Sequence, residues 1–564
     1  MPITSIIPAT PSIDVGRQRP AISLLPTLRG PRGLPGASGE EVNVGTRAYA
    51  ETQSIGAGVS FLRTAGYATV GDGGAALYIR AMSDPGAGGF QSADGAWWAL
   101  SDVFVTPQMF GAAGDGVTDD SAALQEAVDA SLAVRLPPGN YLVTTPIDLR
   151  IGSSIVGAGR DATRITVGAA IAALRRHHTV EAQGNILIAD LAIEGGHAGT
   201  TGISFVLVDS TEIRSCDFIG LSVNVSIDRG RRHLIEGCTA EGNTSYKAGQ
   251  LKLFSSVDDN YIFYPCVRSY YVNCGLFDAG VVTGCADPAI YTRRTIELRL
   301  DDCQVDHAER DSGADFILIE NDSQGGKING GSSHGAKTGV KFRTGSGVQV
   351  GPGYFEILNH DVDAFTVAAI DIDCSQPGVG VLISIHGGIL TGARSTGLPY
   401  VRARQVIDLL VAGVHIEDYS GNNYGTAFDL DNVIGAVIAN NELRNLETGF
   451  IFGATTGALR IHGNSVINAA AKTSGSFAAA GTRIANNYGL NPLALTTPSL
   501  PASGATYTNN TGVPLRIGIG AGTVSLIAIN GRGTLALAGQ FLLDVGETIA
   551  ITYTVAPTWS FMPM

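Results

Sequence analysis

The sequence predicts an all-β protein whose main part is a parallel β-helix, a solenoid of short strands. A short N-terminal capping helix, a small N-terminal β module and a C-terminal antiparallel β domain complete the prediction. Three observations support it. Glycine provides 74 of the 564 residues and charged residues only 16%, which suits a fold with many turns. Apolar residues recur at steps of 22–25 positions, and one helix-like stretch precedes many strand-like ones.

Residues 1–41 contain a short collagen-like run near their end. Glycine stands at every third position, with two prolines between: Gly30, Pro31, Gly33, Pro35, Gly36 and Gly39. Only glycine fits at the crowded axis of a triple helix, so we interpret the run as a short coupling between three chains. A Pro/Gly-rich linker is the alternative, because so few triplets are not stable alone.

Charge and hydropathy exclude several classes of protein. The net charge of −14 argues against nucleic acid as a partner. The first residues lack a basic start followed by an apolar run, so we expect no secretory signal. No stretch reaches the ~18 apolar residues of a membrane span, so we expect no membrane insertion. The seven cysteines fall at strand positions, which favours buried thiols over disulfides.

Residues 42–103 predict a small β module, or neck, rich in Gly and Ala. Trp97 and Trp98 are its largest side chains. We expect them to pack the module against the cap of the β-helix. The alternative is an aromatic platform for a sugar.

The β-helix is predicted for residues 104–490. A glycine-rich loop near its start precedes Asp119 and Asp120, either of which can cap a helix with its side-chain oxygens. Apolar residues then follow at helical spacing: Ala122, Ala123, Leu124, Ala127 and Val128. After a Pro-Pro-Gly turn the apolar period changes to two, as in strands. A helix in this place covers the open edge of the first coil.

Repeats make the coils of the solenoid countable. An early set has steps of 25 and 22 residues: Ile188, Ile213 and Ile235. Three residues beyond each stand Leu191, Cys216 and Cys238. A later set has steps of 23: Ile438, Ile461 and Ile484, followed by Asn441, Asn464 and Asn487. We expect these asparagines to form an internal ladder from coil to coil and interpret them as structural.

The pattern changes again in residues 491–564. A linker rich in turn residues leads into strands of alternating polarity, which predict a separate antiparallel β domain. Its predicted role is trimerisation or glycan binding. A simple cap on the last coil is the plainer alternative.

One motif runs through the start of the β-helix. The pattern F-G-A-x-G-D-G-x-T-D-D, then L-P-x-G-x-Y, then G-x-G is carried by Phe110, Gly111, Ala112, Gly114, Asp115, Gly116, Thr118, Asp119, Asp120, Leu136, Pro137, Gly139, Tyr141, Gly157 and Gly159. This stretch resembles the pectate-lyase-like right-handed β-helix family. The resemblance implies the fold but does not choose a chemistry, because the family includes lyases, hydrolases and phage tailspikes.

Together with the glycine run, the missing signal and the C-terminal domain, the resemblance implies a phage tailspike or related depolymerase. Such a protein is a homotrimer in the virion, attached to the phage tail or baseplate through its N-terminus. It binds a bacterial surface polysaccharide (O-antigen, capsule or exopolysaccharide) and hydrolyses its glycosidic bonds. Two alternatives stay open: a polysaccharide lyase of the same fold, and a receptor-binding fibre that holds glycan without cutting it.

Carboxylates gather in the irregular middle of the predicted β-helix. Strand alternation there turns Glu297, Arg299 and Asp301 to the outer face. Glu320 lies 23 residues after Glu297, and Asp322 lies 21 after Asp301, both close to one coil. We therefore expect the two acidic pairs to stack.

Stacked carboxylates suit a glycosidase. Neighbouring coils lie ~4.8 Å apart, and retaining and inverting glycosidases need carboxyl separations of ~5–5.5 Å and ~6.5–9.5 Å. The predicted catalytic residues are Glu297, Asp301, Glu320 and Asp322. The predicted substrate-binding residues are Arg299, Tyr270, Tyr271, Asp302 and Asp306. A solvated acidic face without catalysis is the alternative.

A lyase would use other groups. Hydrolysis needs no metal and no other cofactor here, whereas a lyase would admit Ca²⁺ at Asp258-Asp259 or Asp301-Asp302. The polygalacturonase motifs of the superfamily are not present in order.

Overall fold

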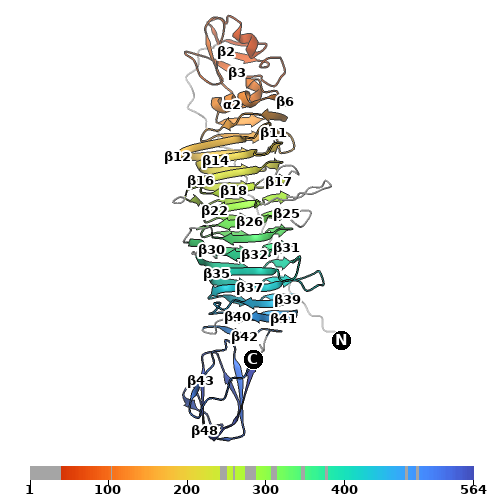
Figure 1. Cartoon of the computed structure of the whole chain (residues 1–564). Coiled ribbons are helices and arrows are strands. Elements are labelled where there is room, and N and C mark those ends of the chain that lie inside the picture. The colour runs from red at the N-terminus through yellow and green to blue at the C-terminus, as the bar shows by residue number, and fades with distance from the viewer. Residues whose placement is uncertain are drawn as a thin grey trace, which may run out of the picture.

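A computed structural model describes residues 40–102, 104–241, 250–257, 261–273, 287–306, 314–344, 350–374, 379–476, 481–490 and 495–564. Asp258 and Asp259, and the glycine triplets before residue 40, lie outside these ranges. The chain forms an elongated stack with a small sheet at one end and a separate β domain at the other (Figure 1). The predicted all-β fold with a long parallel sheet is confirmed.

The small N-terminal module is a five-stranded sheet in the order β1-β2-β3-β5-β4. Its elements are β1 (Glu40–Val44), α1 (Arg47–Glu51), β2 (Val59–Thr64), β3 (Leu77–Ala81), β4 (Phe90–Gln91) and β5 (Trp97–Leu100). Trp98 is fully buried, its Nε1 donates a hydrogen bond to Ser92 Oγ at 3.0 Å, and the Arg80 guanidinium lies 4.6 Å from its ring. Trp98 therefore fills the module's own core, which excludes it as a sugar platform.

The predicted capping helix is present as α2 (Ser121–Ala130), after a 3-10 turn, η1 (Pro107–Phe110). Its buried stripe consists of Ala123, Leu124, Ala127 and Val128. Asp119 accepts hydrogen bonds from the Ser121 N–H and hydroxyl, while the Asp120 carboxylate accepts from the N–H groups of Ala113 and Gly114. One aspartate thus supports the start of the helix, and the other fixes the glycine loop before it.

In the described parts of the chain the β-helix is one sheet of 37 parallel strands, in which strands pair with those of the adjacent coils. Its first strands are β6 (Asp115–Asp119), β7 (Ala133–Leu136), β8 (Gly139–Val143), β9 (Ile147–Asp148), β10 (Ser154–Gly157), β11 (Thr163–Val167), β12 (Ala172–Ala189), β13 (Ala192–Gly195), β14 (Thr201–Arg214), β15 (Asp217–Ile219), β16 (Val223–Glu236) and β17 (Thr239–Glu241).

The central strands are β18 (Gln250–Phe254), β19 (Ile262–Phe263), β20 (Cys266–Arg268), β21 (Tyr271–Asn273), β22 (Ile290–Arg293), β23 (Thr295–Ile296), β24 (Arg299–Asp301), β25 (Gln304–Asp306), β26 (Asp315–Glu320), β27 (Lys327–Asn329), β28 (Ser332–His334), β29 (Thr338–Arg343), β30 (Val350–Leu358), β31 (Asp361–Asp363), β32 (Ala368–Asp373), β33 (Val379–His386) and β34 (Ile389–Thr391). The last are β35 (Pro399–Ala412), β36 (His415–Glu417), β37 (Thr426–Ile434), β38 (Val437–Ala439), β39 (Glu442–Phe452), β40 (Arg460–His462), β41 (Ser465–Gly475) and β42 (Arg483–Ala485).

Each central coil has four faces, which we name A to D in chain order. Face A contains β22, β26, β29 and β32; face B contains β19 and β23; face C contains β20, β24 and β27; face D contains β21, β25, β28 and β31. Side chains that alternate inward along these strands form one continuous apolar core. Function therefore depends on the outward-facing side chains and on the corners between faces.

The predicted asparagine ladder is confirmed at the corner between faces C and D. Asn441 Nδ2 donates to Asn464 Oδ1 at 2.9 Å, and Asn464 Nδ2 donates to Asn487 Oδ1 at 2.8 Å. Cys216 and Cys238 occupy the same internal position in earlier coils. They are free thiols, as are Cys266, Cys303 and Cys374 among the described residues.

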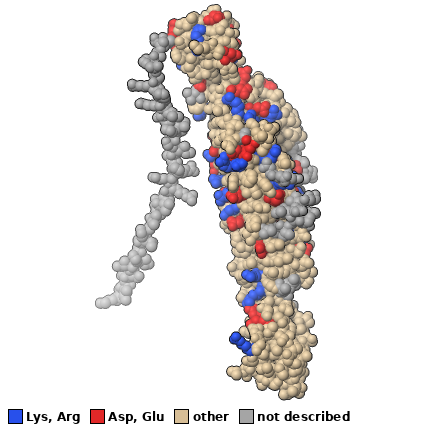
Figure 2. All heavy atoms as spheres, turned by 90° about the vertical axis from the view of Figure 1, so that its left-hand side faces the viewer, with Lys and Arg blue, Asp and Glu red and all other residues tan. Residues whose placement is uncertain are grey.

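The C-terminal domain consists of two antiparallel sheets, ordered β43-β48-β45-β46 and β47-β44-β49. Its strands are β43 (Thr506–Thr508), β44 (Leu515–Gly520), β45 (Thr523–Ile529), β46 (Arg532–Gly533), β47 (Gly539–Leu543), β48 (Thr548–Val555) and β49 (Thr558–Pro563). Arg483 forms an ion pair with Asp544, and the Ile484 N–H donates to Gly512 O at 2.6 Å, which joins the domain to the last coil. Few charged side chains lie on the face of this domain that Figure 2 displays.

Among the described residues, no helix has both the length and the apolar character needed to cross a membrane.

Candidate functional site

The predicted stacking of acidic pairs is wrong. Asp301 pairs with Asn329 in the next coil, and the Glu297 N–H donates to Gln324 O. Glu297 therefore lies beside Gly325, not beside Glu320. The step from Asp301 to Asn329 is 28 residues rather than the 21–23 assumed from the regular coils, because this coil carries extra residues between faces D and A.

The carboxylates of Glu320 and Asp322 already form ion pairs with arginine side chains of the same chain. Glu320, at the end of β26, is buried, forms an ion pair with Arg343 and accepts a hydrogen bond from the Tyr291 hydroxyl at 2.8 Å. Burial, and then the Glu320 carboxylate, raise the pKa of the Tyr291 phenol. Asp322 accepts from the Tyr261 hydroxyl at 2.9 Å and lies 3.3 Å from Arg294 Nε. Both acids are therefore engaged in holding coils together.

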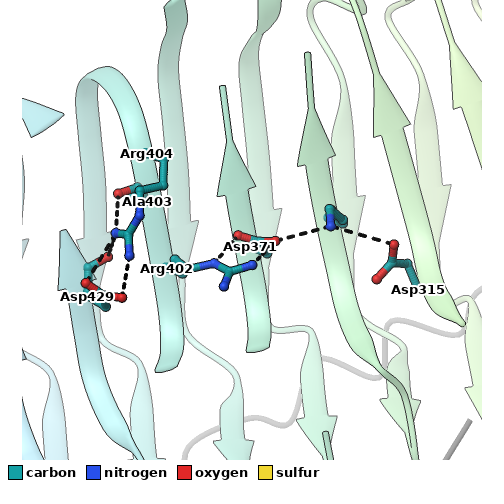
Figure 3. A network of polar contacts seen from close by, with 7 residues as sticks. Asp315, Asp371, Arg402, Ala403, Arg404 and Asp429 are labelled. Atoms are coloured by element: carbon teal, nitrogen blue, oxygen red, sulfur yellow. Dashed lines mark hydrogen bonds and ion pairs between the residues drawn. The ribbon is translucent and has the colours of Figure 1, made fainter. Parts of the chain in front are cut away.

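Face A carries a larger network of the same kind (Figure 3). Arg402 donates two hydrogen bonds of 2.7 Å to the fully buried Asp371, and the Lys341 ammonium lies 3.5 Å from the same carboxylate. Hydrogen bonding to Asp371 raises the pKa of Arg402. In the adjacent coil pair Arg404 contacts Asp429 at 2.6 Å. Positive and negative charges thus alternate from coil to coil, and we interpret face A as structural.

Tyr270 was predicted to stack on sugars, but it is fully buried, so this prediction is wrong. Its hydroxyl accepts a hydrogen bond from Asn224 Nδ2 at 3.1 Å. Backbone bonds place it in the internal ladder between Cys238 and Cys303. The cause is a left-handed corner at Ser269, with φ 47°, which turns the following side chain inward.

The remaining predicted binding residues are spread over face D and its corner. Tyr271 is half-buried on face D, and Asp306 pairs with His334 there. Asp302 is exposed at the corner between faces C and D, and Asp301 lies 3.5 Å from Arg268. Within the described ranges no group of three or more acidic, His or Cys side chains is arranged to hold a metal ion. These residues do not form one site with Glu297.

A groove with a volume of about 610 Å³ lies at the corner between faces B and C. Two predicted residues, Glu297 and Arg299, line it. The other lining residues are Gly325, Gly326, Lys327, Tyr354, Phe355, Glu356, Leu382, Ile383, Ser384, His386, Asp408 and Leu410. We call this cavity the corner groove.

The groove is built from two columns of side chains that run along the solenoid. One column, at the corner, contains Glu297, Gly325, Tyr354, Leu382 and Asp408 in successive coils. The other, on face C, contains Arg299, Lys327, Glu356, Ser384 and Leu410. Tyr354 and Leu382 are 56% and 49% exposed, which leaves an apolar strip between polar groups.

A glycine forms part of the floor. A Cβ atom at Gly326 would lie 1.8 Å from the Phe355 ring, which is buried below the groove. Any larger residue would displace that ring into the core or the groove.

Three carboxylates face the groove at regular intervals. Glu297 and Asp408 lie in the corner column and Glu356 in the face C column. Each is two coil steps from the next, so their backbones are at least ~10 Å apart. Flexible side chains can shorten this distance to the ~6.5–9.5 Å that inverting glycosidases use. Lys327 Nζ lies 3.5 Å from Glu356, and His386 lies one coil further along. The arrangement is suited to holding a sugar and transferring protons to and from it.

Sequence reasoning missed most of these residues because it searched only the segment richest in carboxylates. The signal that finds them is the coil register. The Cys and Asn positions of the internal ladder do not supply it here, because the coils between Cys303 and Asn441 have Gly331, His360, Gly388 and Val414 at that position.

Comparison with known proteins agrees with the architecture. Residues 104–186 match the family described as rhamnogalacturonase A/epimerase, pectate lyase-like. The chain contains a pectate-lyase-like β-helix domain. The matched part covers the cap and first coils and ends before the corner groove.

Two kinds of relative share this domain. The pre-neck appendage proteins of Bacillus phages phi29 and PZA are 27% identical over 125 residues, 21% of this chain and 15% of theirs. A mannuronan C5-epimerase of Azotobacter vinelandii is 39% identical over 107 residues, 16% of this chain and 12% of the relative. The chain thus spans less than a sixth of the length of these relatives, one kind of which is a carbohydrate-active enzyme.

Solved structures that are similar to the chain have low sequence identity to it. The N-terminal fragment of phage phi29 gene product 12 has a TM-score of 0.48 at 14% identity, covering 68% of this chain and 65% of that one. Tailspike protein 3 of bacteriophage CBA120 has a TM-score of 0.46 at 15% identity, covering 75% and 70%.

Proposed function

We propose that the chain is a phage-particle protein that binds a bacterial surface polysaccharide in the corner groove and hydrolyses its glycosidic bonds. The observation that carries the proposal is the groove itself, which combines three carboxylates with an exposed tyrosine. The similarity to phage pre-neck appendage proteins supports a place in the virion, and the similarity to an epimerase of mannuronan supports a saccharide as ligand.

Roles follow from position. Tyr354 offers a flat apolar surface for one sugar ring, and Arg299 and Lys327 are placed to hold hydroxyl or carboxylate groups. We assign water activation to Glu356, whose carboxylate contacts Lys327, and proton donation to Glu297 on the corner column. Asp408 is the third acid within the groove, and it takes the role of Glu297 or Glu356 if the sugar binds closer to the C-terminal coils.

The test uses the full-length protein and a panel of purified lipopolysaccharides and capsular polysaccharides. Hydrolysis predicts new reducing ends without new ultraviolet absorbance. Absorbance from an unsaturated uronate would instead identify a lyase. Saturable binding of a panel member without any cleavage would identify a receptor-binding fibre.

A further inference from the structure

The corner between faces B and C has an unusual choice of residues. The described coils turn there through a residue with positive φ, and eight of these residues are not glycine. Ser210 (68°) and Ala458 (54°) are small. The six between them have larger side chains: Arg232 (58°), Tyr264 (55°), Glu297 (56°), Tyr354 (58°), Leu382 (53°) and Asp408 (60°). Backbone pairing places the last five in one column with Gly325. Arg232 occupies the same corner one coil before Tyr264.

The corner between faces C and D makes the same turn with small residues. Its positive-φ positions include Asp190, Ser215, Gly237, Ser269, Asp302, Gly330, Asn359, Gly387, Gly413, Asn440, Gly463 and Asn486. Left-handed backbone is least costly for Gly and Asn and most costly for bulky side chains. The fold can therefore build such a turn at little cost, and along this stretch of the corner between faces B and C it does not. The corner between faces A and B also contains large residues with positive φ: Leu207, Arg229, Arg294 and Gln405. Such strain is concentrated where a side chain is needed for function.

The column of large corner residues continues beyond the corner groove, toward the N-terminal end of the β-helix. Tyr264 precedes Glu297 in the column, is 48% exposed and lies beside Phe263, their ring centroids 6.1 Å apart. Phe263 pairs with Ile296 in the next coil, so it adjoins the coil that contains Glu297.

A second cavity begins at this point. It has a volume of about 320 Å³ and is lined by Thr179, Val180, Glu181, Leu207, Arg229, Gly230, Arg231, Tyr261 and Phe263. The Arg231 guanidinium lies 6.0 Å from the Phe263 ring centroid and donates to Glu181 at 2.6 and 2.7 Å. Aromatic faces beside paired charged groups suit a sugar, whose ring has an apolar face and hydrogen-bonding edges.

We propose that Tyr264, Phe263 and this second cavity form a distal subsite for the same linear saccharide, which lies along the corner parallel to the solenoid axis. The inference rests on the proposed function of the corner groove. Tyr264 and Tyr354 are three coil steps apart, about 14 Å, so only a chain longer than a few sugars contacts both. The strained corner presents one ring to each end of the bound chain.

The test compares Tyr264→Gly with Tyr488→Gly, which removes a ring that is 74% exposed and lies outside both cavities. The probe is surface polysaccharide purified from the strain that the wild-type protein binds, at full length and as the short fragments left by exhaustive digestion. Affinities are measured by calorimetry, and urea midpoints are recorded for each variant.

We expect Tyr264→Gly to weaken binding of the full-length chain at least tenfold, to leave binding of short fragments unchanged, and to keep or raise the urea midpoint. Tyr488→Gly should bind both probes like wild type. Unchanged affinity of Tyr264→Gly for the full-length chain, or an equal loss for both lengths, would overturn the subsite. If the wild-type protein binds no polysaccharide of the panel, both the proposed function and the subsite are wrong. The wild-type measurement alone shows this, whereas a failure of the subsite alone shows only in the comparison of the variants.

Discussion

The carboxylates of the central coils differ in the side chains that already contact them within the protein. Glu320 is buried and contacts Arg343 and Tyr291, whereas Glu297 and Glu356 line an open groove. A carboxylate whose oxygens are already bonded within the protein has little capacity to serve a substrate. This difference, rather than the density of acids in the sequence, separates structural from candidate catalytic residues.

The first prediction concerns the acids of the groove. Glu356→Gln and Glu297→Gln should each lower turnover by at least ~10², because general acid–base help contributes ~10²–10⁴. Polysaccharide affinity should stay close to wild type, since the amide keeps the shape of the side chain. Release of reducing ends and calorimetric binding provide the two measurements.

The control for this prediction is Glu320→Gln, which breaks the ion pair with Arg343 on face A. It should lower the urea midpoint and leave turnover per folded molecule unchanged. Full activity of both groove variants together with loss of turnover in Glu320→Gln would move the active site to face A.

A second prediction concerns pH. Burial lowers the pKa of His233 from 6.5 to about 3 and also lowers that of His360. Below pH 6.5 the unfolded chain binds protons that the folded chain does not, so stability is present above that pH and is lost as pH falls. For His233 the loss is about 1.4 kcal/mol per pH unit below pH 6.5, or about 2 kcal/mol at pH 5.

Urea unfolding at pH 7 and pH 5 measures this loss. His233→Gln should reduce the difference between the two pH values, whereas the same change at the exposed His197 should not. An identical pH dependence in wild type and His233→Gln would contradict the assignment.

At the scale of elements, the asparagine ladder ties successive coils at the corner between faces C and D. Asn464 donates to Asn487 Oδ1 and to Ile438 O, and its own Oδ1 accepts from Asn441. Each amide therefore satisfies buried groups on both neighbouring coils.

The third prediction is that Asn464→Asp destabilises the protein by about 2–5 kcal/mol, because it places an uncompensated charge and removes donors in the core. Asn468→Asp, the same change at an exposed position nearby, should have little effect. Thermal unfolding of the two variants decides the question, and equal midpoints would count against the ladder as a stabilising element.

Elements were more predictable than their register. The capping helix, the strand-rich solenoid and the asparagine ladder follow from local patterns that the sequence displays directly. The site does not, because the step from Asp301 to Asn329 is 28 residues, longer than the steps of 22–25 that the regular coils display. Tyr270 shows the same limit: its burial depends on the backbone at Ser269, which no alternation pattern reveals.

For the whole molecule, the C-terminal domain is the part best suited to self-association. Residues 495–564 contain only four charged residues, Arg516, Arg532, Asp544 and Glu547, so their charges cancel while the full chain carries −14. Exposed apolar side chains on the domain include Leu526, Leu535, Leu537, Leu542, Val555 and Met562. A neutral apolar surface can meet copies of itself without charge repulsion.

The fourth prediction is a particle of about three times 58.3 kDa. Light scattering at micromolar concentration measures it, and a stable monomer would rule out the trimer. Deleting the residues after Leu490 should weaken assembly, and so should Leu542→Glu, which adds one like charge per chain on the domain. If both variants remain trimeric, the contacts that hold the trimer lie elsewhere in the chain.

The described strands of the β-helix pair with strands of the adjacent coils, and this arrangement affects how the protein can change during evolution. A run of coils that begins and ends at equivalent corners can be exchanged as a unit. Another run of any length can replace it if its first and last coils fit their neighbours, and the cap and the C-terminal domain are then undisturbed. The coils that carry the corner groove form such a run. Recombination within the solenoid can therefore alter the surface that meets a saccharide in one step, while the rest of the architecture is inherited intact.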